Sequence, residues 1–275
     1  MNQQLIEDMV RIALQEDIGG GDVTAQLIPE DENSSATVIS REAAVICGCR
    51  FVDEVFRQLD NTVTVDWLAV DGDIVEPGAV LCTLAGKSRS LLTGERCALN
   101  FLQTLSGTAT LTQRYVKAIG DNPAKLLDTR KTIPGMRLAQ KFAVACGGGT
   151  NHRVGLYDAF LIKENHIHAA GSIREAVDTA RAIAPDLLLE VEVETFAQLD
   201  EALDCGVKRI LLDNFSLADL EKAVSIAGDK ADLEASGNIS LENIQAVART
   251  GVDYISTGSI TKHIYAIDLS MRFND

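Results

Sequence analysis

Apolar residues change their spacing along the chain, and each spacing predicts a different kind of element. Near the start they recur at helical intervals, which predicts an amphipathic helix that ends close to the run Gly19–Gly21. Between residues 36 and 84 they fall into short β-branched runs separated by glycine-containing turn dipeptides, which predicts strands joined by turns. Helical spacing returns over 91–119, where Ser106-Gly107 is predicted to separate two helices.

From residue 125 onward, strand-like runs alternate with helical segments. The predicted strands are Lys125–Asp128, Ala159–Lys163, Leu187–Val193, Arg209–Asp213, Ala231–Ala235 and Tyr254–Ser256. The predicted helix starts carry capping pairs, which are Ser172 with Glu175, Thr195 with Gln198, and Ser216 with Asp219. This alternation predicts parallel strands covered by helices, in either a closed barrel or an open doubly wound sheet.

Polar or small residues follow the C-terminal end of each predicted strand. They are Arg130 and Lys131, Lys163, Glu192, Asp213, Ser236-Gly237, and Thr257-Gly258. In a parallel barrel these ends meet at one mouth, whereas in a doubly wound sheet only the ends near the switch point meet. Six recurring contributions favour the barrel. Because a full barrel has about eight units, an incomplete barrel is predicted.

The strand-like sequence EVEVE places three carboxylates on one face of a strand. Glu190, Glu192 and Glu194 are two residues apart, so they share a face that a parallel sheet normally keeps apolar. An edge strand with its carboxylates in solvent would explain Glu194. For Glu192 the nearby Lys and Arg residues favour an inward, paired position, and Asp213 is a second candidate of this kind. Together these two carboxylates could hold Mg²⁺ or bind sugar hydroxyls.

Two late turns have the composition of phosphate sites. Ser236-Gly237 and Thr257-Gly258 each follow a predicted strand and precede a predicted helix. Backbone N–H groups at such turns point toward a bound anion. Each turn alone is explained by ordinary loop chemistry, but two on neighbouring late units favour a phosphate site.

The acidic composition limits the class of protein. A formal net charge of −15 argues against a general nucleic-acid binder. No stretch reaches membrane-spanning length, and the N-terminal segment lacks the basic region of a secretory signal. The six cysteines are scattered, and the Cys47-x-Cys49 pair indicates buried reduced thiols rather than a metal site. These features predict a cytoplasmic protein without nucleic-acid or membrane partners.

Basic residues are nevertheless concentrated in one segment. Between Lys125 and His168 seven basic residues accompany three acidic ones, together with three of the four histidines and the run Gly147–Gly149. A solvated basic face is the plainer explanation. The apolar runs and glycines between the cations favour instead a pocket for a small polyanion.

Several blocks of sequence resemble the quinolinate phosphoribosyltransferase family, whose members are also called nicotinate-nucleotide pyrophosphorylases (carboxylating). The blocks are LLTGERCALNFLQTLSG at 91–107, DTRKTIPGMR at 128–137, KFAVACGGGTNHRVGLYDAFLIKENHI at 141–167, EVEVET at 190–195, LLDNF at 211–215 and LEASGNI at 233–239. They occur in the family's order and span most of the chain.

The resemblance implies an N-terminal α/β sandwich over 1–105, an incomplete α/β barrel of the type II phosphoribosyltransferase kind over 106–261, and a tail, 262–275, that returns to the first domain. It also implies a reaction. Quinolinate and phosphoribosyl pyrophosphate would give nicotinate mononucleotide, pyrophosphate and CO₂, with Mg²⁺ as cofactor, in NAD biosynthesis. The implied assembly is a homodimer or a multiple of dimers.

Site residues follow from the same resemblance. The residues implied around the quinolinate carboxylates are Arg130, His152, Arg153 and Lys163, with Arg96 from the neighbouring subunit. Lys131 would approach both substrates. Glu192 and Asp213 would bind the ribose hydroxyls and Mg²⁺, the metal largely through the substrate, and would act with Lys131 in catalysis. Ser236, Gly237, Thr257 and Gly258 would hold phosphate.

Three other functions compete with this one. A relative of the same fold could use another acceptor, such as nicotinate, or belong to the proteins that occur beside molybdenum-transport genes. The pair Arg130 and Arg153 with Lys163 favours a dicarboxylate. A Schiff-base aldolase could use Lys163 as its amine. A carrier protein is suggested by VDGDIVEPGAVLCTLAG, which resembles half of a biotinyl or lipoyl domain but lacks the modified lysine.

Overall fold

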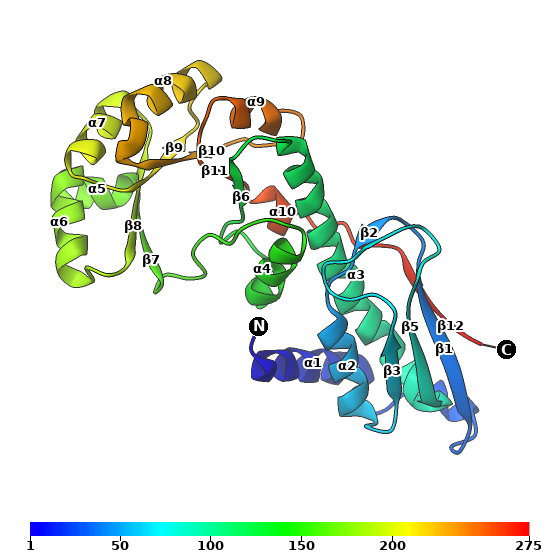
Figure 1. Ribbon diagram of the computed structural model, residues 1–275. Coiled ribbons are helices and arrows are strands. Elements are labelled where there is room, and N and C mark those ends of the chain that lie inside the picture. Colours follow the sequence, from blue (N-terminus) through cyan, green and yellow to red (C-terminus); the bar gives the residue numbers. More distant parts are fainter. Residues whose placement is uncertain (275) are drawn as a thin grey trace. The chain divides into compact units, whose positions relative to one another are not determined.

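The computed structural model describes residues 1–274, which form two compact units (Figure 1). The first unit comprises residues 1–113, 138–148 and the tail from residue 264, and the second comprises residues 114–137 and 149–263. The boundary expected at residues 105 and 106 falls inside one long helix. Among the described residues, none of the helices is long and apolar enough to cross a membrane.

The first unit is built on an antiparallel sheet with the strand order β12-β1-β5-β3. Its elements are α1 (Gln3–Ile18), η1 (Ala25–Leu27), β1 (Asn33–Ser40), β2 (Ala44–Val45), α2 (Cys49–Leu59), β3 (Thr64–Trp67), β4 (Ile74–Val75), β5 (Val80–Lys87), most of α3 (Ser88–Ile119), most of α4 (Arg137–Cys146) and β12 (Leu269–Phe273). Strands β2 and β4 form a separate two-stranded sheet. The tail joins this unit because β12 pairs with β1, from Ala36 opposite Phe273 to Ser40 opposite Leu269.

The predicted opening helix is confirmed as α1. Its apolar stripe buries Ile6, Val10 and Leu14, while the Asn2 side chain accepts a hydrogen bond from the backbone N–H of Gln4 and caps the first turn. The helix ends at Ile18 and is capped by Gly19, whose φ of 51° suits a residue without Cβ.

The predicted break at Ser106-Gly107 is wrong, because α3 runs without interruption from Ser88 to Ile119. Both residues serve tertiary contacts instead. The Ser106 hydroxyl accepts a hydrogen bond from the Cys47 backbone N–H at 2.9 Å. A Cβ added at Gly107 would collide with the carbonyl oxygen of Tyr265 in the tail. Glycine is therefore found in mid-helix where another segment of backbone approaches closely.

The second unit contains a parallel sheet with the strand order β6-β11-β10-β9-β8-β7. Its elements are β6 (Lys125–Leu127), β7 (Ala159–Ile162), α5 (Glu164–Ala170), α6 (Ile173–Ile183), β8 (Leu188–Val193), α7 (Phe196–Asp204), β9 (Arg209–Asp213), α8 (Leu217–Ala227), η2 (Gly228–Lys230), β10 (Asp232–Ser236), α9 (Ile244–Arg249), β11 (Tyr254–Ser256) and α10 (Ser259–Lys262). All six predicted strands are present. The predicted caps Ser172, Thr195 and Ser216 each accept a hydrogen bond from the expected backbone N–H.

This strand order is that of an incomplete barrel. Strands β7 to β11 lie side by side in chain order and β6 follows β11, whereas within residues 1–274 no ladder joins β6 to β7. Helices α6 to α9 cover the outer face (Figure 1). The fully buried Val191 and Val193 lie on one face of β8, so Glu190 and Glu192 lie on the opposite, inner face. The predicted fold class is confirmed.

The contact at Gly107 gives a test of this packing. Helix propensity alone predicts that Gly107→Ala stabilises the protein by about 1 kcal/mol. We expect the opposite, a loss of about 2 kcal/mol in the free energy of unfolding, because the new methyl group displaces the tail backbone at Tyr265. Urea denaturation measures the difference. Gly20→Ala, whose Cβ would meet nothing within 4 Å, is the matched control; a stabilised Gly107→Ala variant would contradict this account.

Candidate active site

The C-terminal ends of four strands and the loops after them surround a cavity of about 400 Å³, which we call the strand-end cavity. Its lining residues are Thr129, Lys131, Asp213, Asn214, Ser236, Gly237, Asn238, Ile239, Ser256, Thr257, Gly258, Ser259 and Lys262. The predicted residues Lys131, Asp213, Ser236-Gly237 and Thr257-Gly258 are thus brought together. The convergence arises because parallel strands present all of their carboxyl ends at one edge.

Two non-glycine residues in the lining of the strand-end cavity have a positive backbone φ, which side chains disfavour. Asn214 and Asn238 have φ of 56° and 51°, and they are the non-glycine residues with positive φ among those described. A Cβ at Gly237, where φ is 99°, would collide with the Asn214 side chain. Such conformations cluster at functional sites. Neither asparagine was predicted as a site residue, although both lie inside the quoted blocks LLDNF and LEASGNI.

A second cavity of about 580 Å³ lies against β7, α5 and α6, and we call it the edge cavity because β7 is an edge strand. Three of the predicted cations, Arg130, Arg153 and Lys163, line it. The rest of its wall is largely apolar, and the remaining lining residues are Leu156, Ala159, Phe160, Leu161, Ile162, His166, Ala170, Ala176, Thr179, Ala180 and Ile183. This combination suits a partly apolar molecule that carries negative charge.

The arginines of the edge cavity repel each other. Burial and the neighbouring Arg130 charge lower the pKa of Arg153 from its usual value. The Nε atom of Arg130 is buried and has no hydrogen-bond partner within the described part of the chain. Guanidinium groups held together in this way are stabilised by an anion that accepts their hydrogen bonds.

Lys163 pairs directly with Glu192. The pair confirms the inward, compensated position predicted for Glu192. The edge-strand explanation for Glu194 is wrong, because β8 lies between β7 and β9; Glu194 is exposed because it follows the last residue of β8, Val193. The lysine backbone is also fixed, because its N–H donates to Nδ1 of His166 at 3.0 Å.

A buried ionic cluster lies on the inner face of the sheet. Nε2 of His152 is 2.8 Å from Glu190 Oε2 and 3.6 Å from Glu234 Oε2. Arg209 contacts both carboxylates, with Nε 3.4 Å from Glu190 Oε1 and Nη2 2.9 Å from Glu234 Oε2. Its guanidinium also lies 3.5 Å from the centre of the Tyr254 ring. We call His152, Glu190, Arg209 and Glu234 the buried cluster.

Charge counting indicates where the buried cluster carries its proton. The contact with Glu190 outweighs burial and raises the pKa of His152, but its Nδ1 accepts from the Arg153 N–H, so the ring is counted as neutral. Two carboxylates against one arginine then leave one negative charge, which burial makes costly. Burial and the Glu190 charge raise the pKa of Glu234 to about 7. Burial opposes ionisation of Glu190, but its bonds to His152 and the Arg209 charge hold its pKa below the usual value. A protonated Glu234 beside an ionised Glu190 makes the cluster neutral.

The buried cluster does not suit a metal ion. His152, Glu190 and Glu234 place their ligand atoms within 4.8 Å of one another, the spacing of a three-residue metal site. However, the Arg209 guanidinium already contacts both carboxylates, so a cation there would meet a like charge. Glu192 and Asp213 offer hard oxygen atoms nearer the strand ends, and Asn214 Nδ2 donates to Asp213 Oδ2 at 2.8 Å.

The other predicted residues are placed as follows. His152 is nearly buried, and Lys131 is exposed, with its carbonyl accepting from Thr261 Oγ1 at 2.7 Å. Arg96 belongs to the first unit, where it is exposed on α3. Arg209 and Glu234 were not predicted. Arg209 begins a strand-like run and Glu234 lies inside one, and nothing in the residue pattern alone indicates that they meet.

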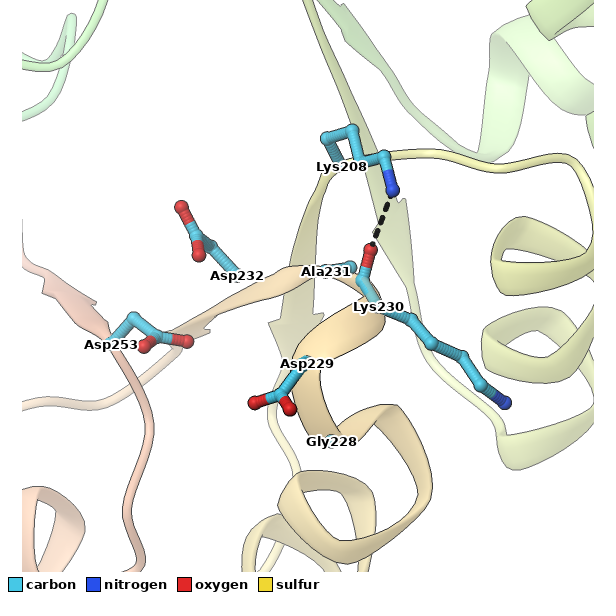
Figure 2. A pocket seen from close by; sticks show the side chains of 7 residues that line it. All are labelled: Lys208, Gly228, Asp229, Lys230, Ala231, Asp232 and Asp253. Atoms are coloured by element: carbon cyan, nitrogen blue, oxygen red, sulfur yellow. Dashed lines mark hydrogen bonds between the residues drawn. The ribbon is translucent and has the colours of Figure 1, made fainter.

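A further pocket of about 360 Å³ lies at the opposite, N-terminal ends of β9, β10 and β11. Figure 2 shows its lining, in which Lys208 Nζ donates to the carbonyl of Lys230 at 3.2 Å, beside the carboxylates of Asp229, Asp232 and Asp253. Because functional residues of parallel barrels gather at the C-terminal ends, we assign this pocket no part in the site.

Comparison with known proteins identifies the family. The quinolinate phosphoribosyl transferase N-terminal domain matches residues 22–106, and the C-terminal domain of the same enzyme matches residues 108–272. The chain belongs to the quinolinate phosphoribosyltransferase family. A probable nicotinate-nucleotide pyrophosphorylase (carboxylating) of Bacillus subtilis strain 168 is 40% identical over 272 residues, which cover 98% of this chain and 94% of the relative.

Solved structures of family members agree with this fold over the whole chain. The nicotinate-nucleotide pyrophosphorylase of Francisella tularensis has a TM-score of 0.98 and 50% identity, and the match covers 100% of this chain and 98% of that one. NadC of Streptococcus pyogenes has a TM-score of 0.96 and 40% identity, covering 100% of this chain and 99% of that one.

The raised pKa of Glu234 gives a test by stability. Because its pKa is about 7 when folded and about 4.5 when unfolded, its proton stabilises the fold at low pH, and this contribution is lost as the pH rises through 7. Glu234→Gln imitates the protonated form. Between pH 5 and pH 8 we expect the free energy of unfolding to fall by roughly 2 to 3 kcal/mol more in the unaltered protein than in Glu234→Gln.

Urea denaturation across this pH range measures the difference. Glu221→Gln, at an exposed position on α8, is the matched control and should keep the slope of the unaltered protein. Identical slopes for the unaltered protein and Glu234→Gln would show that Glu234 does not hold the proton.

Proposed function

We propose that this protein transfers the phosphoribosyl group of phosphoribosyl pyrophosphate to quinolinate, with loss of CO₂, to form nicotinate mononucleotide. Membership of the family supports the reaction. The observation that carries the proposal is the arrangement of two cation-lined cavities, with the Lys163–Glu192 pair connecting the residues assigned to the two substrates.

The edge cavity supplies the acceptor site. Quinolinate is a flat aromatic ring with two adjacent carboxylates, so it needs both apolar walls and several cations. Arg130, Arg153 and Lys163 supply the cations, and the Arg130 Nε has a free donor for a carboxylate. Lys163 can exchange its partner Glu192 for a substrate carboxylate, which leaves Glu192 to act on the other substrate.

The strand-end cavity supplies the donor site. The glycine turns after Ser236 and Thr257 line this cavity and can present backbone N–H groups to phosphate oxygens, and Lys131 adds a positive charge. Asp213 faces the same cavity and can accept hydrogen bonds from ribose hydroxyls. Gly237 and Gly258 let the backbone approach the ligand closely, and a Cβ at Gly258 would press on the Lys131 side chain at 2.9 Å.

Catalysis then consists of positioning and charge stabilisation. The pyridine nitrogen attacks the anomeric carbon as the bond to pyrophosphate breaks and its electrons leave with the pyrophosphate. Positive charge develops on the ribose, where the carboxylates of Glu192 and Asp213 stabilise it. The ring nitrogen, now quaternary, accepts the electrons released when the 2-carboxylate leaves as CO₂, and a proton replaces it on the ring.

Carboxylate oxygens suit magnesium, and two are offered near the strand ends: Asp213 lines the strand-end cavity and Glu192 pairs with Lys163. Among residues 1–274, neither Glu192 nor Asp213 belongs to a cluster of three His, Cys or acidic side chains that could hold a metal ion. The two carboxylates would therefore hold Mg²⁺ largely through oxygens of the donor substrate. Bound there, Mg²⁺ would neutralise the charge of the pyrophosphate.

The first test is turnover with the two substrates. We expect quinolinate absorbance to decrease only when phosphoribosyl pyrophosphate and Mg²⁺ are present, with one CO₂ and one pyrophosphate released per nicotinate mononucleotide. Nicotinate offered in place of quinolinate should react far more slowly, because it has one carboxylate where the edge cavity presents three cations. Equal turnover of nicotinate without CO₂ would indicate a different acceptor.

We also propose that the protein works as a homodimer in which Arg96 completes the acceptor site of the partner. Exposed apolar side chains support an interface at the edge cavity: Leu156 is 75% exposed and Ile183 is 71% exposed. Strand β7 is also an unpaired edge, which proteins usually cover. Arg96 is exposed on α3 and so is available to another subunit.

Mixed dimers test the shared site. Arg96→Ala and Lys163→Ala should each be inactive alone, because every site in either dimer lacks one cation. Refolding or exchanging the two at equal amounts should restore about a quarter of the unaltered activity, since half of the dimers then contain one intact site. Mixed dimers demonstrated by mass spectrometry but without activity would place Arg96 and Lys163 in the same subunit's site or outside it.

A further inference from the structure

The segment that carries Arg153 belongs to no helix or strand, and side chains hold its backbone instead. Four consecutive N–H groups have side-chain acceptors. His152 N–H donates to Asp128 Oδ1 at 2.8 Å, and those of Val154 and Gly155 donate to the Asp158 carboxylate at 2.6 and 2.8 Å. Arg153 N–H donates to Nδ1 of His152 at 2.7 Å. The His152 ring therefore holds the backbone of Arg153, while the guanidinium itself donates to the Ala159 carbonyl at 3.3 Å.

Both nitrogens of that ring are engaged. Because Nδ1 accepts from Arg153, its lone pair is occupied and the ring carries its proton on Nε2. Nε2 faces Glu190 at 2.8 Å, inside the buried cluster. Because Nδ1 carries no proton and Nε2 faces Glu190, no ring N–H is left to donate to a ligand in the edge cavity. The side chain of His152 is also only 9% exposed.

The buried cluster in turn fixes the ring. Glu190 and Glu234 are 1% and 0% exposed, which excludes direct contact with a substrate at the mouth. Arg209 holds both carboxylates in place, and the Tyr254 ring supports its guanidinium. A connected path of polar contacts thus runs from Arg209 through Glu190 and His152 to the backbone of Arg153, whose guanidinium lines the edge cavity.

We propose that Glu190, Arg209 and His152 are positioning residues for the acceptor, which orient Arg153 through the Nδ1 contact and do not themselves bind the substrate. This inference rests on the proposed function, in which Arg153 binds a carboxylate of quinolinate. The role resembles that of the outer partners that orient metal-binding histidines, here applied to an anion site.

Substitutions at Glu190 test the role of the cluster. Glu190→Leu removes the carboxylate that lies 2.8 Å from Nε2, and Glu234 can then ionise against Arg209, so the remaining buried charges still balance. We expect the KM for quinolinate to rise about tenfold, because the His152 ring loses the contact that fixes it, while the KM for phosphoribosyl pyrophosphate stays unchanged. Glu190→Gln keeps an oxygen beside Nε2 and should restore the KM for quinolinate.

A pair of substitutions at His152 provides a second, independent test. Asparagine places its Oδ1 near the position of Nδ1 and can still accept from Arg153, whereas glutamine places its Nε2 near the position of the ring Nε2. If His152 acts through Arg153, His152→Asn should bind quinolinate several-fold more tightly than His152→Gln. If Nε2 donates directly to the substrate, the order should be reversed.

Titration calorimetry with quinolinate alone, followed by steady-state kinetics, separates the outcomes. Unaltered protein that neither binds nor consumes quinolinate would overturn the proposed function itself. Unaltered protein that binds it, while Glu190→Leu binds it equally well, would overturn only the positioning role. Parallel increases in both KM values for Glu190→Leu, or tighter binding by His152→Gln than by His152→Asn, would also overturn it.

Discussion

The pairing of charges inside the parallel sheet is the interaction on which the rest of the site depends. Carboxylates on the inner face of such a sheet would destabilise it if they stood alone, because burial removes their hydration. Arg209 contacts both Glu190 and Glu234, and one proton neutralises what remains. With this charge balanced, the sheet can carry polar residues through its centre and present a different set of charges at its mouth.

At the mouth of the sheet, by contrast, two arginine charges lie close enough to repel each other. Arg130 and Arg153 are held together without a compensating hydrogen bond at Arg130 Nε, and burial lowers the pKa of Arg153. The surrounding fold maintains the repulsion between the two guanidinium groups, and a bound anion would relieve it. Lys163 differs, because Glu192 already balances its charge. In the proposed reaction, binding the acceptor would require Lys163 to change partner, which would couple the acceptor side of the site to the donor side.

Local signals and tertiary contacts disagree most clearly in the first unit. Ser106-Gly107 has the composition of a helix break, yet α3 continues through it because the Ser106 hydroxyl and the missing Cβ of Gly107 satisfy contacts with other segments. Helix propensity is a weak preference of about 1 kcal/mol per residue. Packing against the tail and hydrogen bonding to Cys47 exceed it, so the break could not be excluded from the local sequence.

The sequence by itself determined the alternation of strands and helices, the caps at Ser172, Thr195 and Ser216, and the placing of polar residues at strand ends. These features follow from local periodicity and side-chain chemistry, which the order of residues contains. Only the tertiary structure decided that the sheet stays open between β6 and β7, that Glu190 meets Arg209 and Glu234, and that Asn214 and Asn238 line the strand-end cavity. Those contacts join residues on different strands, and their geometry depends on strand register and sheet curvature, which no local pattern specifies.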